Sequence, residues 1–206
     1  MAYDEVSSTE YDPNKGDYTR YRGLELIAEQ ISRNNIQGAV AELGVFRGDF
    51  SSEINRIFPD VKLYLFDTFE GCDDSDVEYE REKEYTSKEF IDGCNSFKDT
   101  SVGIVLKKMP HPEQCIVRKG YFPETAQGQE DTFVLVSIDC DLYVPILAGL
   151  EYFYPRLVPG GYIMLHDYNH KEFGVKDAVA DFEKKNGRVC KVPYPDQGGT
   201  LVIYKN

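Results

Sequence analysis

Short apolar runs recur along the chain and alternate with segments whose apolar residues repeat every three or four positions. The clearest run is unbroken from Phe133 to Val136 and leads directly to Asp139 and Asp141. A run this short and apolar on both faces is typical of a strand in the middle of a parallel sheet. Further strands are predicted at 39–43, 61–67, 115–120, 162–168, 188–192 and 200–204.

The intervening segments carry a helical repeat. Leu24, Ile27, Ala28 and Ile31 fall at i, i+3, i+4 and i+7, which predicts a helix over 21–31. Similar apolar faces predict helices at 49–58, 90–105, 146–153 and 175–182. The alternation of strand and helix predicts an α/β fold, with a doubly wound, Rossmann-like, seven-stranded and mostly parallel sheet and helices on both faces.

Two stretches depart from this alternation within the single domain that we expect over residues 1–206. Residues 1–20 are polar and are expected to form an N-terminal arm. Residues 72–100 begin with an acidic segment dotted with aromatic residues. Either this insertion is a solvated helix or loop, or it is a lid over the mouth of the sheet, because long insertions in compact domains are often functional.

Composition narrows the choice of partners. A chain of 206 residues buries about 70% of its unfolded surface as one domain, and its net charge of −13 argues against nucleic acid and anionic membranes as partners. The five cysteines form no CxxC pair, which favours reduced thiols in a cytoplasmic protein. We find no signal peptide and no apolar run near 18 residues, so a soluble protein is expected.

A glycine turn follows the first strand, where the sequence ELGVFRG at 42–48 has the spacing Glu-x-Gly-x-x-x-Gly. This is not the Gly-x-Gly-x-x-Gly of dinucleotide sites, and a carboxylate beside the turn would repel phosphate but suits a cationic ligand. Gly44 permits a tight turn, and Gly48 permits close approach of a ligand or of the strand beneath. Asp67 ends the second strand, where an acid either accepts hydrogen bonds from ribose hydroxyls or caps a helix. Together these residues favour a ligand that contains a nucleoside.

These elements together resemble the class I S-adenosylmethionine-dependent methyltransferases. More narrowly, the chain is similar to the macrocin and mycinamicin sugar O-methyltransferases (the TylF/MycF-like family). The resemblance rests on the sequence YLFDTFEG at 64–71, on Asp139–Tyr143, and on the Tyr-Pro-x-Leu-x-Pro-Gly-Gly segment at 154–161. It also includes His166-Asp167-Tyr168, where the family has an acidic pair before the tyrosine. It extends from about residue 20 to the end of the chain.

The resemblance implies S-adenosylmethionine as cofactor. Glu42 and Gly44 would hold its methionine end, Asp67 its ribose hydroxyls, and Gly120 and Tyr121 would lie near its adenine. The full set that the resemblance implies for the cofactor is Glu42, Gly44, Val45, Gly48, Ser51, Asp67, Thr68, Phe69, Gly120, Tyr121 and Asp139. The acceptor would be a hydroxyl of a sugar or other polyhydroxylated small molecule.

The resemblance further implies a Mg²⁺ site, with Asp139 as ligand and proton acceptor and Asp167 as a second ligand. The two acids would end adjacent strands, which lie about 4.8 Å apart, so both can reach one ion. A divalent cation would stabilise the alkoxide that forms as a sugar hydroxyl loses its proton. Asp141, which enters the following helix, would contact substrate or place charge at the helix N-terminus.

His166 departs from the family pattern and leaves three roles open. As a metal ligand it would favour Mn²⁺, Fe²⁺ or Zn²⁺ over Mg²⁺, and it could share an ion with Asp167 only if the chain is already turning. It could instead be the catalytic general base, or it could hydrogen-bond a carboxylate ligand.

Three alternative functions use the same residues. A phosphatase of the haloacid dehalogenase type would use the Asp139/Asp141 pair as its nucleophile motif, although that motif would normally open the chain. A nicotinamide dehydrogenase is disfavoured by the glycine spacing. A protein that binds the cofactor without turnover is the third alternative. Members of the resembled family often pair, so a homo-oligomer such as a dimer is also expected.

Overall fold

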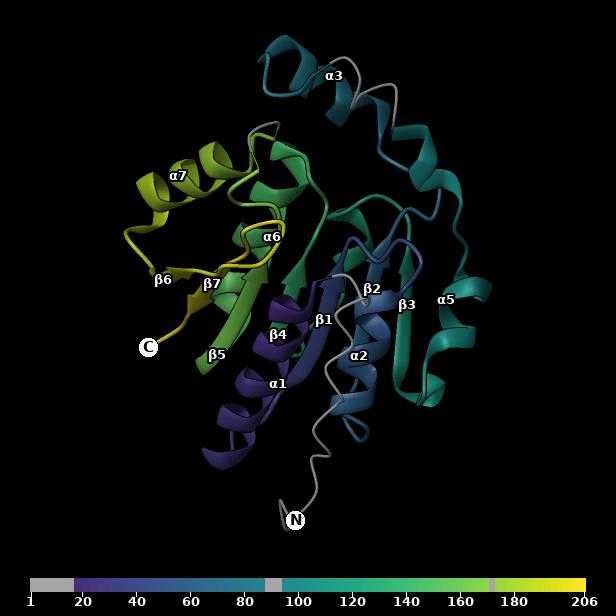
Figure 1. Ribbon diagram of the computed structural model, residues 1–206, viewed down its shortest axis with the longest axis vertical. Coiled ribbons are helices and arrows are strands. Elements are labelled where there is room, and N and C mark those ends of the chain that lie inside the picture. The colour runs from purple at the N-terminus through teal and green to yellow at the C-terminus, as the bar shows by residue number, and fades with distance from the viewer. Residues whose placement is uncertain (1–16, 88–93, 171–172) are drawn as a thin grey trace.

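A seven-stranded sheet forms the centre of the computed structural model, which describes residues 17–87, 94–170 and 173–206 (Figure 1). Neighbouring strands follow the order β3-β2-β1-β4-β5-β7-β6. The strands are β1 Ala39–Leu43, β2 Leu63–Asp67, β3 Cys115–Lys119, β4 Phe133–Ile138, β5 Leu157–Leu165, β6 Cys190–Pro193 and β7 Leu201–Tyr204. β1 to β5 pair in parallel, and β7 is antiparallel to β5 and β6. The predicted doubly wound, mostly parallel sheet is confirmed.

Helices cover both faces of the sheet, as the alternation predicted. One face carries α1 (Tyr18–Arg33), α2 (Asp49–Ile57) and α5 (Val102–Lys108), and the other carries α6 (Tyr143–Arg156) and α7 (Val175–Asn186) (Figure 1). α3 (Asp74–Glu82) lies beyond the end of the sheet, at the top of the view. Short 3₁₀ helices are η1 Cys94–Lys98, η2 Pro112–Gln114 and η3 Glu124–Ala126. Among the described helices, none is long and apolar enough to cross a membrane.

The central strands send alternate side chains into two separate apolar layers. In β2, Leu63 and Leu65 pack with α1 and α2, whereas Tyr64 and Phe66 pack with α6 and its neighbours. A strand covered on both faces needs an apolar residue at each position, which explains why its sequence is an unbroken run. This double burial holds the carboxyl ends of β1, β2, β4 and β5 side by side, and the polar residues that follow them share one edge of the sheet.

The first helix begins earlier than predicted. α1 starts at Tyr18 rather than Tyr21, and the Asp17 side chain caps it by accepting a hydrogen bond from Arg20 N. The N-terminal arm predicted over 1–20 is therefore wrong for residues 17–20, and residues 1–16 lie outside the described part of the chain. The physical reason is that Arg20 is buried against the end of β4, which fixes the first turn of the helix.

The prediction of a single helix over 90–105 is also wrong. Of its span, residues 88–93 lie outside the described chain, and the rest divides into η1 and α5. The break comes at 99–101, where Ser101 adopts an extended conformation and its side chain accepts from Ile104 N, capping α5. Thr100 donates to Phe46 O and Arg47 pairs with Asp99, so this break is tied to the glycine turn.

β5 begins at Leu157, five residues before the start of the strand predicted at 162–168. Gly160 N donates to Lys205 O at 2.7 Å and Lys205 N donates to Gly161 O at 3.0 Å, so the segment pairs with the chain just after β7. Gly160 absorbs the irregularity with a φ of +85°. At its other end β5 stops at Leu165, three residues before the predicted end, so the residues after it are already in a turn.

Candidate active site

A cavity of about 840 Å³ lies where β1, β2, β4 and β5 end. Its walls come from the first turn of α1, the glycine turn after β1, the segment before α3, and the turns after β4 and β5. The predicted site residues that line it are Glu42, Gly44, Val45, Asp67, Thr68, Gly120, Tyr121, Asp139, His166 and Asp167. Gly48, Ser51 and Phe69 were predicted as well but do not line it.

The two glycines of the turn have different surroundings. Gly44 has a φ of +86°, and a Cβ there would overlap the carbonyl group of Asp139. It therefore lets β1 and β4 approach each other at the cavity floor. Gly48 has a φ of +75°, and a Cβ there would lie 2.9 Å from Val105 Cγ1, so its close approach is to α5 rather than to a ligand.

Glu42 is buried in a small polar network beneath the cavity. Its exposed fraction is 1%, and its carboxyl oxygens accept hydrogen bonds from Ser51 Oγ and from Ser137 Oγ. Burial raises the pKa of Glu42 to about 8, because few groups replace the water that a carboxylate needs. Ser51 therefore acts on the site through Glu42.

Asp67 ties the end of β2 to the glycine turn. Its Oδ2 accepts from Val45 N at 2.7 Å and Phe46 N at 2.9 Å, and its Oδ1 accepts from Phe69 N at 2.6 Å. A carboxylate offers about four acceptor positions, so three backbone bonds leave room for one more donor such as a ribose hydroxyl. Its helix-capping alternative does not apply, because the donors belong to turns.

Gly120 and Tyr121 close the β3 side of the cavity. Gly120 N donates to Asp67 O at 3.0 Å, which holds the turn against the end of β2. The Tyr121 hydroxyl donates to Asp76 Oδ1 of α3 at 2.8 Å. Burial raises the pKa of Asp76 to about 6. Burial also raises the pKa of the Tyr121 phenol, and its hydrogen bond to Asp76 raises that pKa further.

Asp139, His166 and Asp167 form the polar cluster that the sequence placed at adjacent strand ends. Each offers a ligand atom within 4.8 Å of the others. His166 Nδ1 lies 3.1 Å from Asp139 Oδ1 and 2.9 Å from Asp167 Oδ2. Asp167 has a φ of +52°, so the chain is turning, which is the condition under which neighbouring residues can face one point.

The ionisable groups of this cluster shift one another's pKa values. Burial opposes a charged His166, but its hydrogen bonds to Asp139 and Asp167 outweigh burial and raise its pKa to about 10. Burial alone would raise the pKa of Asp139, but Arg20 and His166 hold it well below the usual range. Asp141, beside them, has a φ of +59° and its pKa is raised by burial and by the two neighbouring carboxylates.

Arg20 is the site residue that the sequence did not reveal. Its Nη2 lies 2.9 Å from Asp139 Oδ2 and donates to Ser137 Oγ at 3.4 Å, and its guanidinium stacks on Phe50 with 4.0 Å between Cζ and the ring centroid. The signal that could have found it is the N-cap Asp17 three residues earlier, which starts α1 and points its first turn at β4.

The donor set fits a divalent cation. Two carboxylates and one imidazole nitrogen converge within 4.8 Å, and such a mixed oxygen and nitrogen set suits Mn²⁺, Fe²⁺ or Zn²⁺ at least as well as Mg²⁺. Arg20 and His166 each engage one oxygen of Asp139, so an ion there would share that carboxylate with them.

His166 has a second group of acids on its other side. Asp17, His166 and Asp196 also offer ligand atoms within 4.8 Å of one another. Gly198, in the loop between β6 and β7, packs directly against this ring, and a Cβ there would lie 2.5 Å from His166 Nε2. The imidazole is therefore enclosed on both nitrogens.

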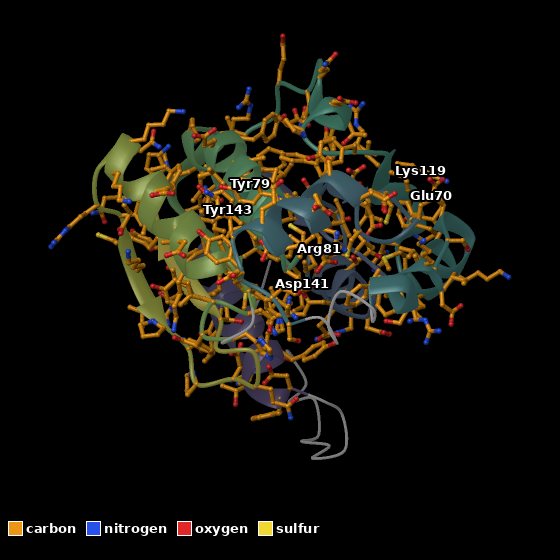
Figure 2. All side chains as sticks on the ribbon, turned by 90° about the horizontal axis from the view of Figure 1, so that it is seen from above. Glu70, Tyr79, Arg81, Lys119, Asp141 and Tyr143 are labelled. Atoms are coloured by element: carbon orange, nitrogen blue, oxygen red, sulfur yellow. The ribbon has the colours of Figure 1, made fainter. Side chains whose placement is uncertain are left out.

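The described part of the insertion is docked over the cavity. Glu80 of α3 is fully buried and accepts a hydrogen bond from Tyr143 N at the start of α6. Tyr79 stacks on Tyr143 with 5.1 Å between ring centroids. Figure 2 looks down on this edge of the sheet and shows Tyr79 and Tyr143 close together, with Asp141 nearer the middle.

Comparisons with known proteins match nearly the whole described chain. The family model for macrocin O-methyltransferase (TylF) matches residues 16–200. An 8-demethyl-8-(2,3-dimethoxy-alpha-L-rhamnosyl)-tetracenomycin-C 4'-O-methyltransferase of Streptomyces olivaceus is 25% identical over 194 residues, which are 91% of this chain and 73% of that protein. A mycinamicin III 3''-O-methyltransferase of Micromonospora griseorubida is 24% identical over 87% of this chain and 74% of its own. The solved structure of the O-methyltransferase NovP superposes with a TM-score of 0.73 at 23% identity, covering 91% of this chain and 80% of that one.

Proposed function

This chain belongs to the TylF family of macrocin O-methyltransferases, which are S-adenosylmethionine-dependent enzymes, and we propose that it methylates a sugar hydroxyl with the help of a divalent cation. The observation that carries the proposal is the cavity itself. It joins the glycine turn and Asp67 to the cluster of Asp139, His166 and Asp167. Membership of this family argues against the phosphatase and the dehydrogenase alternatives. Our proposal of turnover takes the place of the third alternative, a protein that binds the cofactor without catalysis.

The cofactor would lie along the ends of β1, β2 and β3. Its methionine end would rest on the glycine turn above Glu42, where Gly44 lets the backbone approach closely. One ribose hydroxyl would donate to the acceptor position that Asp67 retains, and the adenine would lie beside Gly120 and Tyr121.

The acceptor sugar would lie on the other side of the cavity, above Asp139, Asp141 and Asp167. Rhamnosyl and mycinamicin groups in the names of the relatives support a sugar. A divalent cation held by Asp139, Asp167 and His166 would supply charge stabilisation for the hydroxyl as it loses its proton.

The protein's own residues supply position and charge. Arg20 keeps Asp139 ionised and fixes its orientation, so its carboxylate can accept a hydrogen bond from the acceptor hydroxyl. Methyl transfer is an in-line displacement at the methyl carbon, in which the hydroxyl oxygen attacks and the sulfur leaves as a thioether. Holding the two substrates in line therefore accounts for the larger share of the acceleration, roughly 7–11 kcal/mol where the alignment is good.

The first experiment measures cofactor binding and turnover. Calorimetry measures the binding of S-adenosylmethionine and S-adenosylhomocysteine, with and without Mg²⁺ or Mn²⁺. A second assay measures the transfer of a labelled methyl group to a panel of 6-deoxyhexosides. We expect binding of both nucleosides and methylation of at least one sugar, lost in a chelator and restored by metal. We expect Asp139→Asn to lower kcat by about 10²–10⁴-fold, the range for removal of an acid–base group.

The matched control is Asp131→Asn. Asp131 pairs with Lys62 and Tyr64, away from the cavity, so this variant should keep wild-type turnover. No binding of either nucleoside by the wild type would contradict the proposal as a whole. Full activity in the presence of chelator would contradict the metal alone, and methylation confined to acceptors without sugar hydroxyls would contradict the substrate class.

A further inference from the structure

A buried guanidinium lines the cofactor cavity, and one of its donors has no acceptor. The side chain of Arg20 is 9% exposed and lines the cavity. Its Nη2 is engaged by Asp139 and Ser137, but its Nε has no hydrogen-bond partner among the described residues. A buried N–H of a charged group that lacks an acceptor is strongly destabilising, so such a group commonly meets its acceptor in a ligand.

The charge of the cavity shows what kind of ligand group Arg20 can meet. Acidic side chains dominate the lining, and in the described chain its only arginines or lysines are Arg20 and Arg47. Arg47 is 43% exposed and is already paired with Asp99 at the rim. Arg20 is thus the buried, permanently positive group of the cavity, because a guanidinium keeps its proton in proteins.

The position of Arg20 is fixed before any ligand arrives. Its Cζ lies over the Phe50 ring, 4.0 Å from the ring centroid, and Asp139 and Ser137 hold its Nη2. Ser137 Oγ in turn donates to Glu42, so a cationic group and two acids are arranged within one connected network. A zwitterion needs this pattern, with an acceptor for its ammonium beside a donor for its carboxylate.

From these observations we propose that Arg20 binds the α-carboxylate of S-adenosylmethionine. That carboxylate is the only anionic group of the cofactor. Because the other charged groups that line the cavity are mostly acids, Arg20 is the buried counter-ion that the carboxylate can meet. The guanidinium donates to the carboxylate while Asp139 retains Nη2, and the ammonium, on the same carbon as the carboxylate, lies toward the acids. The inference rests on the proposed function and adds a cofactor-binding residue from α1.

The test compares two cofactors that differ only in the carboxylate. Calorimetry in metal-free buffer measures the dissociation constants of S-adenosylmethionine and of decarboxylated S-adenosylmethionine for wild type, Arg20→Met and Arg20→Lys. Wild type should bind S-adenosylmethionine about 10- to 100-fold more tightly than the decarboxylated compound, the range for hydrogen bonds between charged groups. In Arg20→Met this preference should vanish, and in Arg20→Lys part of it should remain.

The control is Arg22→Met on the same helix. Arg22 is 43% exposed and pairs with Glu25, away from the cavity, so this variant should keep the wild-type preference. Equal loss of affinity for both cofactors in Arg20→Met would overturn the proposal, because it would indicate a role in folding α1. Equal binding of both cofactors by wild type would overturn it without any variant. Failure of the proposed function differs from both results, since wild type would then bind neither cofactor or methylate no sugar.

Discussion

At the scale of single residues, Glu42 is a carboxyl group that the fold removes from water. Arg20 of α1, Ser51 of α2, and Ser137 and Asp139 at the end of β4 all face it. Arg20 and the two hydroxyl groups favour the charged form, while burial and Asp139 oppose it, and burial is the largest effect. The pKa of about 8 means that Glu42 holds its proton in the folded protein at neutral pH.

This raised pKa predicts a pH-dependent stability. Between about pH 4.5 and 8 the unfolded chain releases the Glu42 proton and the folded chain keeps it, so the free energy of unfolding falls as pH rises. The slope from this one group reaches at most about 1.4 kcal/mol per pH unit. Glu42→Gln cannot ionise, so we expect its free energy of unfolding to fall less steeply over this window. Urea unfolding followed by far-UV circular dichroism measures both slopes.

The control for this prediction is Glu29→Gln. Glu29 is an acid on the exposed side of α1, where its side chain is 42% exposed and lies near Arg33. Its variant should follow the wild-type slope, since a solvated carboxyl group titrates alike in both states. Identical slopes for Glu42→Gln and wild type would contradict the assignment of a buried proton to Glu42.

Sequence patterns predicted the acidic residues of the site but not its buried arginine, Arg20. Asp67, Asp139 and Asp167 follow apolar strands, so strand periodicity alone places them at the carboxyl edge of the sheet. Arg20 lies in a polar stretch, and its burial depends on Asp139, which is 119 residues away along the chain. The N-cap Asp17 marks where α1 begins, but no local pattern identifies Asp139 as the partner of Arg20, because packing decides which group a long side chain contacts.

At the scale of elements, α3 is held over the cavity by buried polar contacts. Glu80 accepts from Tyr143 N, one of the donors that the start of α6 leaves unpaired, and Thr86 donates to the same carboxylate. Burial raises the pKa of Glu80, while these donors act in the opposite direction. Within the segment 72–100, α3 is docked on α6, and residues 88–93 lie outside what the structure describes; a lid function for the segment stays a prediction.

Removing this contact should loosen α3. In Glu80→Ala the amide of Tyr143 loses its buried acceptor, and we expect the free energy of unfolding to fall by about 1–3 kcal/mol. Amide hydrogen exchange over 74–82 should accelerate by more than this global loss explains, because the helix loses its attachment to α6. Glu82→Ala, an exposed position on the same helix, is the control. Unchanged exchange in Glu80→Ala would show that the aromatic contacts hold α3 without the carboxylate.

Element boundaries were predictable where burial alternates and not where tertiary contacts decide. The cores of β2, β4 and α7 match the apolar pattern because each contacts the sheet or its cover along its length. The break at 99–101 depends on contacts with Phe46 and Arg47 in the glycine turn, and the extension of β5 through Gly160 depends on Lys205. Neither partner is near in sequence.

At the scale of the whole molecule, the cavity joins parts of the chain that are far apart. Its walls include Arg20 near the start and His166 and Phe173 well past the middle, and the two apolar layers between them share the same strands. Because unfolding of either layer would remove part of the wall, the cofactor site and the fold should be lost together.

Ligand binding should therefore stabilise the chain as one unit. At a concentration of about 100 times its dissociation constant, S-adenosylhomocysteine should raise the free energy of unfolding by about 2.7 kcal/mol. Urea unfolding followed by far-UV circular dichroism and by tyrosine absorbance should shift by the same amount, with an unchanged slope against denaturant. The chain contains 15 tyrosines and no tryptophan, which makes tyrosine the natural second probe. A shift in one probe alone would show that part of the fold unfolds without disturbing the site.

The contact between Gly198 and His166 limits which sequences can share this site. A side chain at 198 would meet His166 Nε2 at 2.5 Å and Asp167 Oδ1 at 2.6 Å, so the loop accepts only a hydrogen atom there while the imidazole keeps its place. An acid at 166, shorter than the ring, would remove the contact with the imidazole but not the one with Asp167 Oδ1. The pair His166-Asp167 therefore requires glycine at 198, 32 positions after the histidine, for as long as the loop keeps this path over the site.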